Sequence, residues 1–269
     1  MSDTQPPSKE QTSAAWSRAS VTYGHVGPRF FQHFGEHLVS VAPIEPGDRV
    51  LDVAAGRGAL LFPAAEKIGP NGEVIGIDYS EGMVARTSAE IQSRGLNNAR
   101  MLQMDAESLD FPDASFDALF CGFAIFMFPN FQKVLSEFYR VLKPGGLLAV
   151  STWGRGDPRW SWLDRLGPPP GSNRTVQFDT AEGMKSILEG AGFTAVQTTE
   201  EELEIFFADE EEWWATSWSH GARLMLEKLP PEVLERGKAF AHEQLSAMKQ
   251  PQGIPMLQIA LFTLARKPA

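Results

Sequence analysis

Short apolar runs alternate with amphipathic stretches through the middle of the chain. The apolar runs are typical of buried strands, and five are predicted here: residues 49–55, 73–78, 99–104, 116–123 and 147–153. The helix predicted at 131–142 shows the clearest period, with Val134, Leu135 and Phe138 on one face. Such regular alternation predicts an α/β fold, with a parallel sheet and helices on both of its faces.

The pattern loosens after Trp153. Residues 154–173 are rich in Gly, Pro, Arg and Trp and are predicted to form a long loop. Beyond this loop we expect a helix at 180–189, a strand at 194–207, two helices within 209–248 and a last strand at 258–266. The sheet is therefore expected to have seven strands.

The chain is predicted to form a single domain, residues 13–269, because it shows no internal repeat and no second core. Two helical additions are expected on this domain: an N-terminal cap at 13–44 and a helical insertion at 208–252, before the last strand. Residues 1–12 are polar and contain prolines, so we expect them to be a mobile tail.

The composition favours small-molecule chemistry. The chain carries 24 Lys and Arg against 34 Asp and Glu, a net charge of −10, which disfavours nonspecific binding to nucleic acids or anionic membranes. It holds a single cysteine, no signal-peptide pattern at its start and no apolar run near the ~20 residues that span a membrane. We therefore expect a cytoplasmic protein without a membrane span, and the sequence leaves its oligomeric state open.

Three carboxylates lie at the ends of the first three predicted strands: Asp52 is close to the end of the first, Asp78 ends the second and Asp105 comes just past the third. Ligands of open parallel sheets bind at the carboxyl ends of the strands, so the three are expected to line one rim. Asp52 precedes a Gly-rich turn at 56–61, where Leu61 replaces the third glycine of a dinucleotide fingerprint. An acid at this place favours a ligand that carries positive charge.

Five motifs occur in order along residues 45–155: VLDVAAGRGAL (50–60), EVIGIDYSEGMV (73–84), QMDAESLDF (103–111), FDALFCGF (116–123) and LKPGGLLAVSTW (142–153). Each alone is weak, but their order and spacing resemble class I S-adenosylmethionine-dependent methyltransferases. Within that superfamily the chain is similar to the ubiquinone/menaquinone-biosynthesis type and related small-molecule methyltransferases. The resemblance implies a Rossmann-like seven-stranded sheet and S-adenosyl-L-methionine as the cofactor.

The resemblance also implies which positions bind this cofactor. The implied contacts are Asp52, Ala54 and Gly56 along the methionine part, Asp78 on the ribose hydroxyls, Tyr79 and Met83 around the adenine, Asp105 and Ala106 at its edge, backbone groups of Cys121 at the methionine end, and Tyr23 at the cofactor carboxylate. A carboxylate accepts two hydroxyl hydrogen bonds, and an acidic rim suits the sulfonium and ammonium groups.

The sequence departs from the family pattern at Ala54, where many relatives have glycine, although a small residue still fits there. The N-P-P-[YF] tetrapeptide of nucleic-acid amino-methyltransferases is replaced by CGFA at 121–124. This replacement agrees with the acidic composition in disfavouring a nucleic-acid substrate.

No catalytic residue is assigned from the sequence. His25, His33 and His220 are weak candidates for a general base, because histidine titrates near neutrality. Residues 33–37 read H-x-x-E-H, a zinc-protease pattern, but Gly35 within the helix and the lack of a third ligand disfavour a metal site. An activated methyl donor can also react through proximity and alignment alone.

The aromatic residues, 7 Trp and 18 Phe against 3 Tyr, predict an apolar acceptor pocket beside the cofactor. Core packing accounts for part of this excess. The residues expected to line the pocket follow the fourth and fifth strands or lie in the helical insertion: Phe123, Phe126, Trp153, Trp214 and Trp218.

We therefore expect in-line methyl transfer to a small hydrophobic metabolite that is aromatic, quinone-like or prenylated, as in secondary metabolism. Two alternatives stay open at this point. The first is a fold relative that binds S-adenosylmethionine without catalysis. The second is an NAD(P)-dependent oxidoreductase, which the missing third glycine disfavours.

Overall fold

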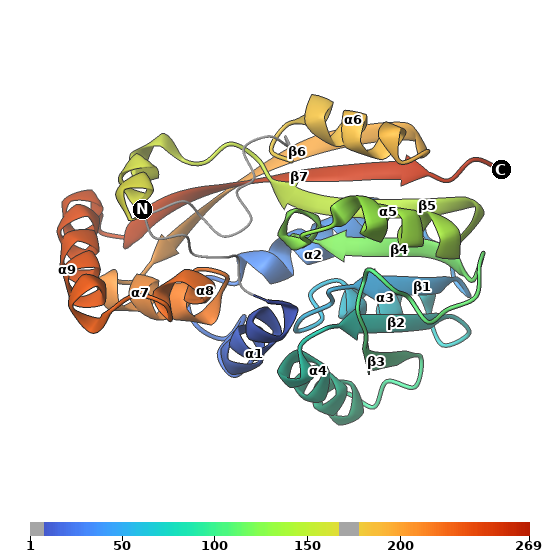
Figure 1. Ribbon diagram of the computed structural model, residues 1–269, viewed down its shortest axis with the longest axis horizontal. Helices are drawn as coiled ribbons and strands as arrows, with labels where there is room; N and C mark the ends of the chain where they lie inside the picture. Colours follow the sequence, from blue (N-terminus) through green and yellow to red (C-terminus); the bar gives the residue numbers. More distant parts are fainter. Residues whose placement is uncertain (1–7, 167–177) are drawn as a thin grey trace.

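The computed structural model describes residues 8–166 and 178–269, and in this part the strands form one sheet of seven (Figure 1). The order across the sheet is β3-β2-β1-β4-β5-β7-β6. The strands are β1 (Arg49–Val53), β2 (Glu73–Asp78), β3 (Ala99–Gln103), β4 (Phe116–Gly122), β5 (Leu142–Trp153), β6 (Thr194–Phe207) and β7 (Ile254–Arg266). The expected α/β class and seven-stranded Rossmann-like sheet are confirmed.

The sheet is mixed rather than purely parallel. Strands β1 to β5 pair in parallel, but β7 runs antiparallel to both β5 and β6. The predicted parallel sheet is therefore wrong for its last strand. The reason is topological, since β6 and β7 are joined by an insertion that lets the chain turn back, whereas parallel neighbours require a crossover.

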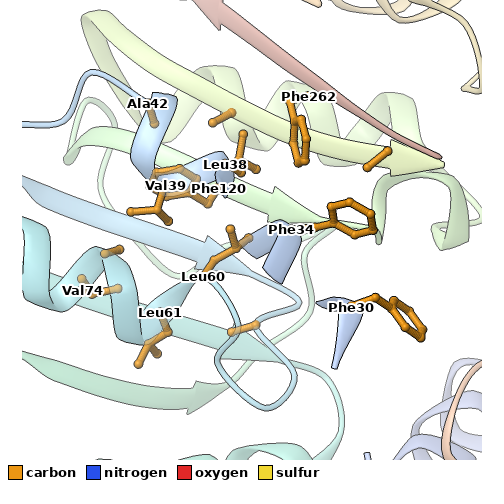
Figure 2. Close-up of a cluster of buried hydrophobic side chains, with 14 of the residues drawn as sticks. Phe30, Phe34, Leu38, Val39, Ala42, Leu60, Leu61, Val74, Phe120 and Phe262 are labelled. Atoms are coloured by element: carbon orange, nitrogen blue, oxygen red, sulfur yellow. The ribbon is translucent and has the colours of Figure 1, made fainter. Parts of the chain in front are cut away.

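Helices cover both faces of this sheet. They are α1 (Lys9–Ala19), α2 (Phe30–Val41), α3 (Leu61–Ile68), α4 (Glu81–Ser93), α5 (Phe131–Val141), α6 (Ala181–Gly190), α7 (Glu210–Ser219), α8 (Arg223–Leu226) and α9 (Pro231–Met248). One buried cluster joins α2 and α3 to the sheet, with Phe34 and Leu38 fully buried (Figure 2). A second cluster joins α5 and α6 to the opposite face.

Helix α2 packs closely on the chain before α3. A Cβ atom on Gly35 would lie 2.3 Å from the backbone oxygen of Ala59, so only glycine fits at this contact. The helical glycine that weakened the zinc interpretation is therefore needed for packing. Because Gly35 has no side chain, α2 can pack against the turn that follows β1.

Helix α1 begins inside the segment that was expected to be a mobile tail. The Ser8 side chain accepts a hydrogen bond from the Gln11 backbone, and the Gln11 side chain accepts one from the Ser8 backbone. This capping box starts the helix at Lys9, so residues 8–12 are helical or capping rather than a tail. Residues 1–7 of the expected tail lie outside the described residues.

Three further boundaries differ from the prediction. Strand β5 starts at Leu142, because the KPGG segment pairs through Leu142 with Phe116 across a register shift instead of ending in a turn. A short 3-10 helix, Pro158–Arg165, forms within the expected loop 154–173, whose remainder from residue 167 is outside the described residues. The insertion holds three helices, where two were expected.

Strands β6 and β7 form a ribbon longer than the rest of the sheet. They pair from Thr194 with Arg266 to Phe207 with Ile254, whereas β5 stops pairing with β7 at Trp153 and Ala260. Among the described strands, the first part of β7 therefore pairs with β6 alone. Figure 1 shows this ribbon reaching toward α7 and α9.

Candidate active site

A cleft opens at the carboxyl ends of the central strands. The strand order reverses at β1, which lies between β2 and β4, and ligands of open α/β sheets bind at such a point. Two adjoining cavities of about 330 and 190 Å³ occupy it. Their shared lining residues are Tyr23, Ala54, Gly56, Gly122 and Phe123.

The turn after β1 brings backbone close to this cleft. Gly56 has a φ of 53° and Ala54 a φ of 56°, both in the left-handed region. Alanine at position 54 therefore carries backbone strain that glycine would not. A Cβ atom on Gly122 would lie 2.7 Å from Leu60, so this side of the cleft also depends on a missing side chain.

Two buried carboxylates make the cleft acidic. Asp52 is 1% exposed, and neither of its oxygens has a hydrogen-bond partner in the described residues. Burial, together with the nearby charge of Asp78, raises the pKa of Asp52 well above its usual value. Burial also raises the pKa of Asp78 to about 6. The unpartnered, buried carboxyl of Asp52 favours a cationic ligand that returns the lost interactions.

Asp78 is held in a fixed orientation at the end of β2. Its oxygens accept hydrogen bonds from the backbone of Gly56 at 3.0 Å and of Ser80 at 2.8 Å. Ser80 in turn caps α4 by accepting from the Met83 backbone. The strand end, the glycine turn and the helix start are therefore tied together around one carboxylate.

The smaller cavity brings together the residues that the sequence assigned to the nucleoside. Its lining includes Asp78, Tyr79, Met83, Asp105 and Ala106. These residues follow β2 and β3 or begin α4, as their positions in the motifs predicted.

Helix α1 forms one side of this smaller cavity. Lys9 Nζ lies 2.7 Å from an Asp105 oxygen and 3.0 Å from Glu107. Partial burial opposes a charge on Asp105, but the hydrogen bond and charge of Lys9 outweigh it and lower the pKa of this carboxyl. The Ser17 and Ser80 hydroxyls lie 2.8 Å apart, which joins α1 to α4. Lys9 was not predicted as a site residue, because residues 1–12 were expected to be a mobile tail.

Cys121, whose backbone groups were expected at the methionine end of the cofactor, lies within β4. Strand β4 continues to Gly122, and the fully buried thiol does not line the cleft. Burial raises the pKa of this thiol. The nearby residues that reach the cleft are Gly122 and Phe123.

A third and larger cavity, of about 790 Å³, lies on the other side of a layer of aromatic rings. Its lining includes Trp153 and Trp214, which were predicted, and Phe30, Phe31 and His220. The remaining lining comes from the helical insertion, the start of β7 and the segment after β5. The insertion and the sheet thus enclose an aromatic cavity beside the acidic cleft.

The other predicted pocket residues lie elsewhere. Phe123 lines the cleft and stacks on Trp153, with ring centres 4.1 Å apart. Phe126 packs near Phe178 in the second core cluster. Trp218 packs edge-on against Trp214 and lines none of these three cavities.

The three candidate histidines lie in three different parts of the structure. His25 lines the larger cavity of the cleft. His33 Nε2 lies 2.6 Å from Glu201 on β6, and His37 lies 2.9 Å from the same carboxylate, so this pair joins α2 to the sheet. His220 lines the aromatic cavity, and burial lowers its pKa to about 4, which keeps it neutral at pH 7.

The family described as "Methyltransferase domain" matches residues 44–204, which run from just before β1 into β6 and include the strand ends that form the cleft. This chain belongs to the methyltransferase-domain family. The resemblance to class I S-adenosylmethionine-dependent methyltransferases is thus confirmed, and with it the enzyme class and the methyl donor of that class. In the described residues, no helix is long and apolar enough to cross a membrane.

Curated relatives extend this match. Nocamycin O-methyltransferase of Saccharothrix syringae is 30% identical over 236 residues, 81% of this chain and 84% of the relative. Aklanonic acid methyltransferase DauC of Streptomyces sp. strain C5 is 39% identical over 144 residues, 54% of this chain. The matched stretch spans 66% of DauC and 44% of the demethylmenaquinone methyltransferase of Geobacillus kaustophilus, which is 40% identical over 104 residues.

Solved structures share the fold. The YcgJ protein of Bacillus subtilis has a TM-score of 0.63 at 24% identity, covering 88% of this chain and 99% of its own. The [4+2]-cyclase SpnF has a TM-score of 0.57 at 21% identity, covering 88% of this chain and 82% of its own. Because a cyclase has the same fold, the fold alone does not fix the reaction.

Proposed function

We propose that this methyltransferase transfers the methyl group of S-adenosylmethionine to a small hydrophobic acceptor, aromatic, quinone-like or prenylated, bound in the aromatic cavity. The observation that carries this proposal is the placement of a large aromatic cavity next to an acidic cleft, with one layer of rings between them. The relatives named for aklanonic acid, nocamycin and demethylmenaquinone support a small-molecule acceptor. We place this activity in the cytoplasm.

The cleft fits the cofactor on its own features. The Asp52 carboxyl, which has no hydrogen-bond partner in the described residues, is assigned to the amino end, whose positive charge favours the ionised form of this carboxyl. The left-handed turn at Ala54 and Gly56 lets backbone approach the methionine part. Tyr23, which lines both cavities of the cleft, is assigned to the methionine end. Cys121 is assigned no direct contact, and Gly122 takes its place.

At the nucleoside end, Asp78 is assigned to the ribose hydroxyls, because its carboxylate faces the smaller cavity and is already oriented by two backbone amides. Tyr79 and Met83 are assigned to the faces of the adenine, and Asp105 with Ala106 to its edge. Because Lys9 pairs with Asp105, α1 closes over this end of the site.

When bound, the cofactor supplies a methyl group activated on a sulfonium. The chain has to hold the acceptor in line with it and exclude water. The stacked rings of Phe123 and Trp153 provide an apolar wall for this alignment. His220 is neutral, so it is assigned as a hydrogen-bond partner for a polar atom of the acceptor. A strong general base is not assigned, since a pKa of about 4 makes His220 a weak base.

The proposal is tested by incubating the protein with methyl-labelled S-adenosylmethionine and a panel of quinones, phenols and indoles. Label in an extractable product, with S-adenosylhomocysteine formed in equal amount, is the expected result. Cofactor binding without transfer to any member would instead support a non-catalytic binder. Binding of NAD(P) in place of S-adenosylmethionine would overturn the proposal.

A further inference from the structure

Phe31 holds a particular place between the two ligand spaces. It lines the larger cavity of the acidic cleft and also lines the aromatic cavity, and in the described residues it is the one side chain common to both. It is the second residue of α2, next to Phe30, whose ring is buried in the core. The wall between the two spaces is therefore one ring thick at this point.

Aromatic neighbours hold the Phe31 ring on several sides. Its ring is stacked with that of Tyr23, with centres 5.3 Å apart. It meets the rings of Phe123 at 5.5 Å and Trp153 at 5.7 Å. On the side of the helical insertion it meets His220 edge-on at 5.2 Å. Phe31 thus contacts rings that line the cleft and rings that line the aromatic cavity.

The opposite side of this wall is also fixed. Phe123 has a φ of 50°, a left-handed conformation that is rare for a bulky residue and is found mostly at functional sites. Its backbone amide donates to the Ser151 oxygen at 2.9 Å, which holds the strained residue against β5. The strained backbone keeps the Phe123 ring against Trp153, facing Phe31.

We propose that Phe31 is the specificity-determining residue between donor and acceptor: both ligands contact its ring, which couples their binding and limits the size of acceptor that reaches the methyl group. This inference rests on the proposed function. The reacting atoms must approach to about 3–3.5 Å, so the ring lies beside the transfer path rather than across it. Each ligand packs on one side of the same ring and so completes part of the surface that the other ligand contacts, which gives positive cooperativity.

The first test measures this coupling without catalysis. The Kd of 2-naphthol is determined by tryptophan fluorescence with and without saturating S-adenosylhomocysteine. In the wild type we expect at least about fivefold tighter binding of 2-naphthol in its presence, and the same factor in the reciprocal titration. In Phe31→Ala the factor should fall below about twofold. The coupling factor of Phe31→Leu, which keeps an apolar side chain, should lie between those of the wild type and Phe31→Ala.

Phe240→Leu is the matched control. Phe240 is also half-buried and lies among aromatic rings, 6.0 Å from Trp162, but it lines none of the three cavities. This variant should keep the wild-type coupling. Thermal melting of each variant checks the fold. If Phe31→Ala does not fold, the coupling factor of Phe31→Leu is compared with that of Phe240→Leu instead.

The second test uses the reaction and a graded series of acceptors: phenol, 2-naphthol and 2-hydroxyanthracene. Removal of the Phe31 ring widens the passage between the two spaces, so Phe31→Ala should raise the kcat/KM ratio of the three-ring to the one-ring acceptor at least about tenfold. Unchanged coupling and an unchanged ratio in Phe31→Ala would overturn the inference. A wild type that binds no S-adenosylhomocysteine or methylates no acceptor would overturn the proposed function itself.

Discussion

Asp78 combines two properties that are in tension. It is a buried carboxylate whose pKa is raised to about 6, yet its proposed role needs the ionised form to accept hydrogen bonds from ribose hydroxyls. Two backbone amides already stabilise the charge, but they do not compensate for the burial. The free protein therefore carries an electrostatic cost at neutral pH that a bound ligand relieves.

We expect Asp78→Asn to weaken S-adenosylhomocysteine binding about 10- to 100-fold at pH 7.5, because a hydrogen bond to a charged group contributes roughly 1.5–3 kcal/mol. In the wild type the affinity should fall about tenfold from pH 7 to pH 5, as Asp78 is protonated around its pKa of about 6. Isothermal titration calorimetry measures both. Asp110→Asn, at an exposed carboxylate, is the control and should keep the wild-type affinity.

His220 makes the stability of the fold depend on pH. Its pKa is lowered from 6.5 to about 4 by burial, so between these values the unfolded chain binds a proton that the folded protein does not. The stability that depends on neutral His220 is present above about pH 6.5 and is lost as the pH falls toward 4.

At pH 5 this loss amounts to about 2 kcal/mol, from 1.36 kcal/mol per pH unit. His220→Asn should remove that part of the pH dependence of the free energy of unfolding, measured by urea denaturation at pH 7 and pH 5. His25→Asn, at an exposed histidine, is the matched control. Equal pH dependence in the His220 variant and the wild type would contradict the assignment.

The sequence identified strand-end residues better than residues on helices. Asp52, Asp78 and Asp105 were found because the carboxyl end of a strand can be located from its apolar run and the following turn. Phe31 was missed because it lies on the same face of α2 as Gly35 and Leu38, which are buried. An apolar residue on the buried face of an amphipathic helix indicates core packing, and nothing in the sequence distinguishes it from a residue that also lines a ligand cavity.

At the scale of elements, α1 is held over the cleft by ion pairs at both of its ends and by its packing on α4 and α8. Lys9 joins its first turn to Asp105 and Glu107, Arg18 joins its last turn to Glu227, and the helix packs on α4. Surface ion pairs contribute little individually, so most of the docking free energy comes from packing. An element held in this way can open locally without unfolding the domain.

Lys9→Gln is expected to increase amide hydrogen exchange in α1 by severalfold and to weaken S-adenosylhomocysteine binding by less than about tenfold, because an exposed ion pair contributes roughly 0.2–1 kcal/mol. Exchange followed by mass spectrometry, with and without S-adenosylhomocysteine, measures the effect. Lys185→Gln is a control, since Lys185 pairs only within α6 at 3.9 Å from Glu189. An α1 exchange rate like that of wild type would show that Lys9 does not hold the helix.

Element boundaries were predicted well where local signals are strong. Strand β2 and strand β6 were predicted at their observed bounds, and α5 and α6 within one residue. The helix start at Lys9 was missed because its capping box has no hydrophobic run behind it. The direction of β7 could not be predicted, since a strand's own residues do not specify the orientation of its neighbour.

At the scale of the whole molecule, ligand binding should be visible as stability. A ligand that binds only the folded state at 100 times its Kd adds about 2.7 kcal/mol to the free energy of unfolding. For a chain of this size we expect S-adenosylhomocysteine to raise the Tm by roughly 5–10 °C in differential scanning fluorimetry. NADH at the same concentration should leave the Tm unchanged, and the reverse pattern would favour an oxidoreductase.

The ribbon of β6 and β7 has a consequence for how such an enzyme changes its substrate. The insertion leaves the sheet after Phe207 and returns at Ile254, and these two residues are directly paired. A segment whose ends are neighbours can be exchanged as a cassette without moving the strands that carry it. Evolution or an engineer can therefore replace the wall of the aromatic cavity that the insertion supplies, while the cleft stays intact, provided that the cassette keeps a partner such as Glu227 for Arg18 of α1.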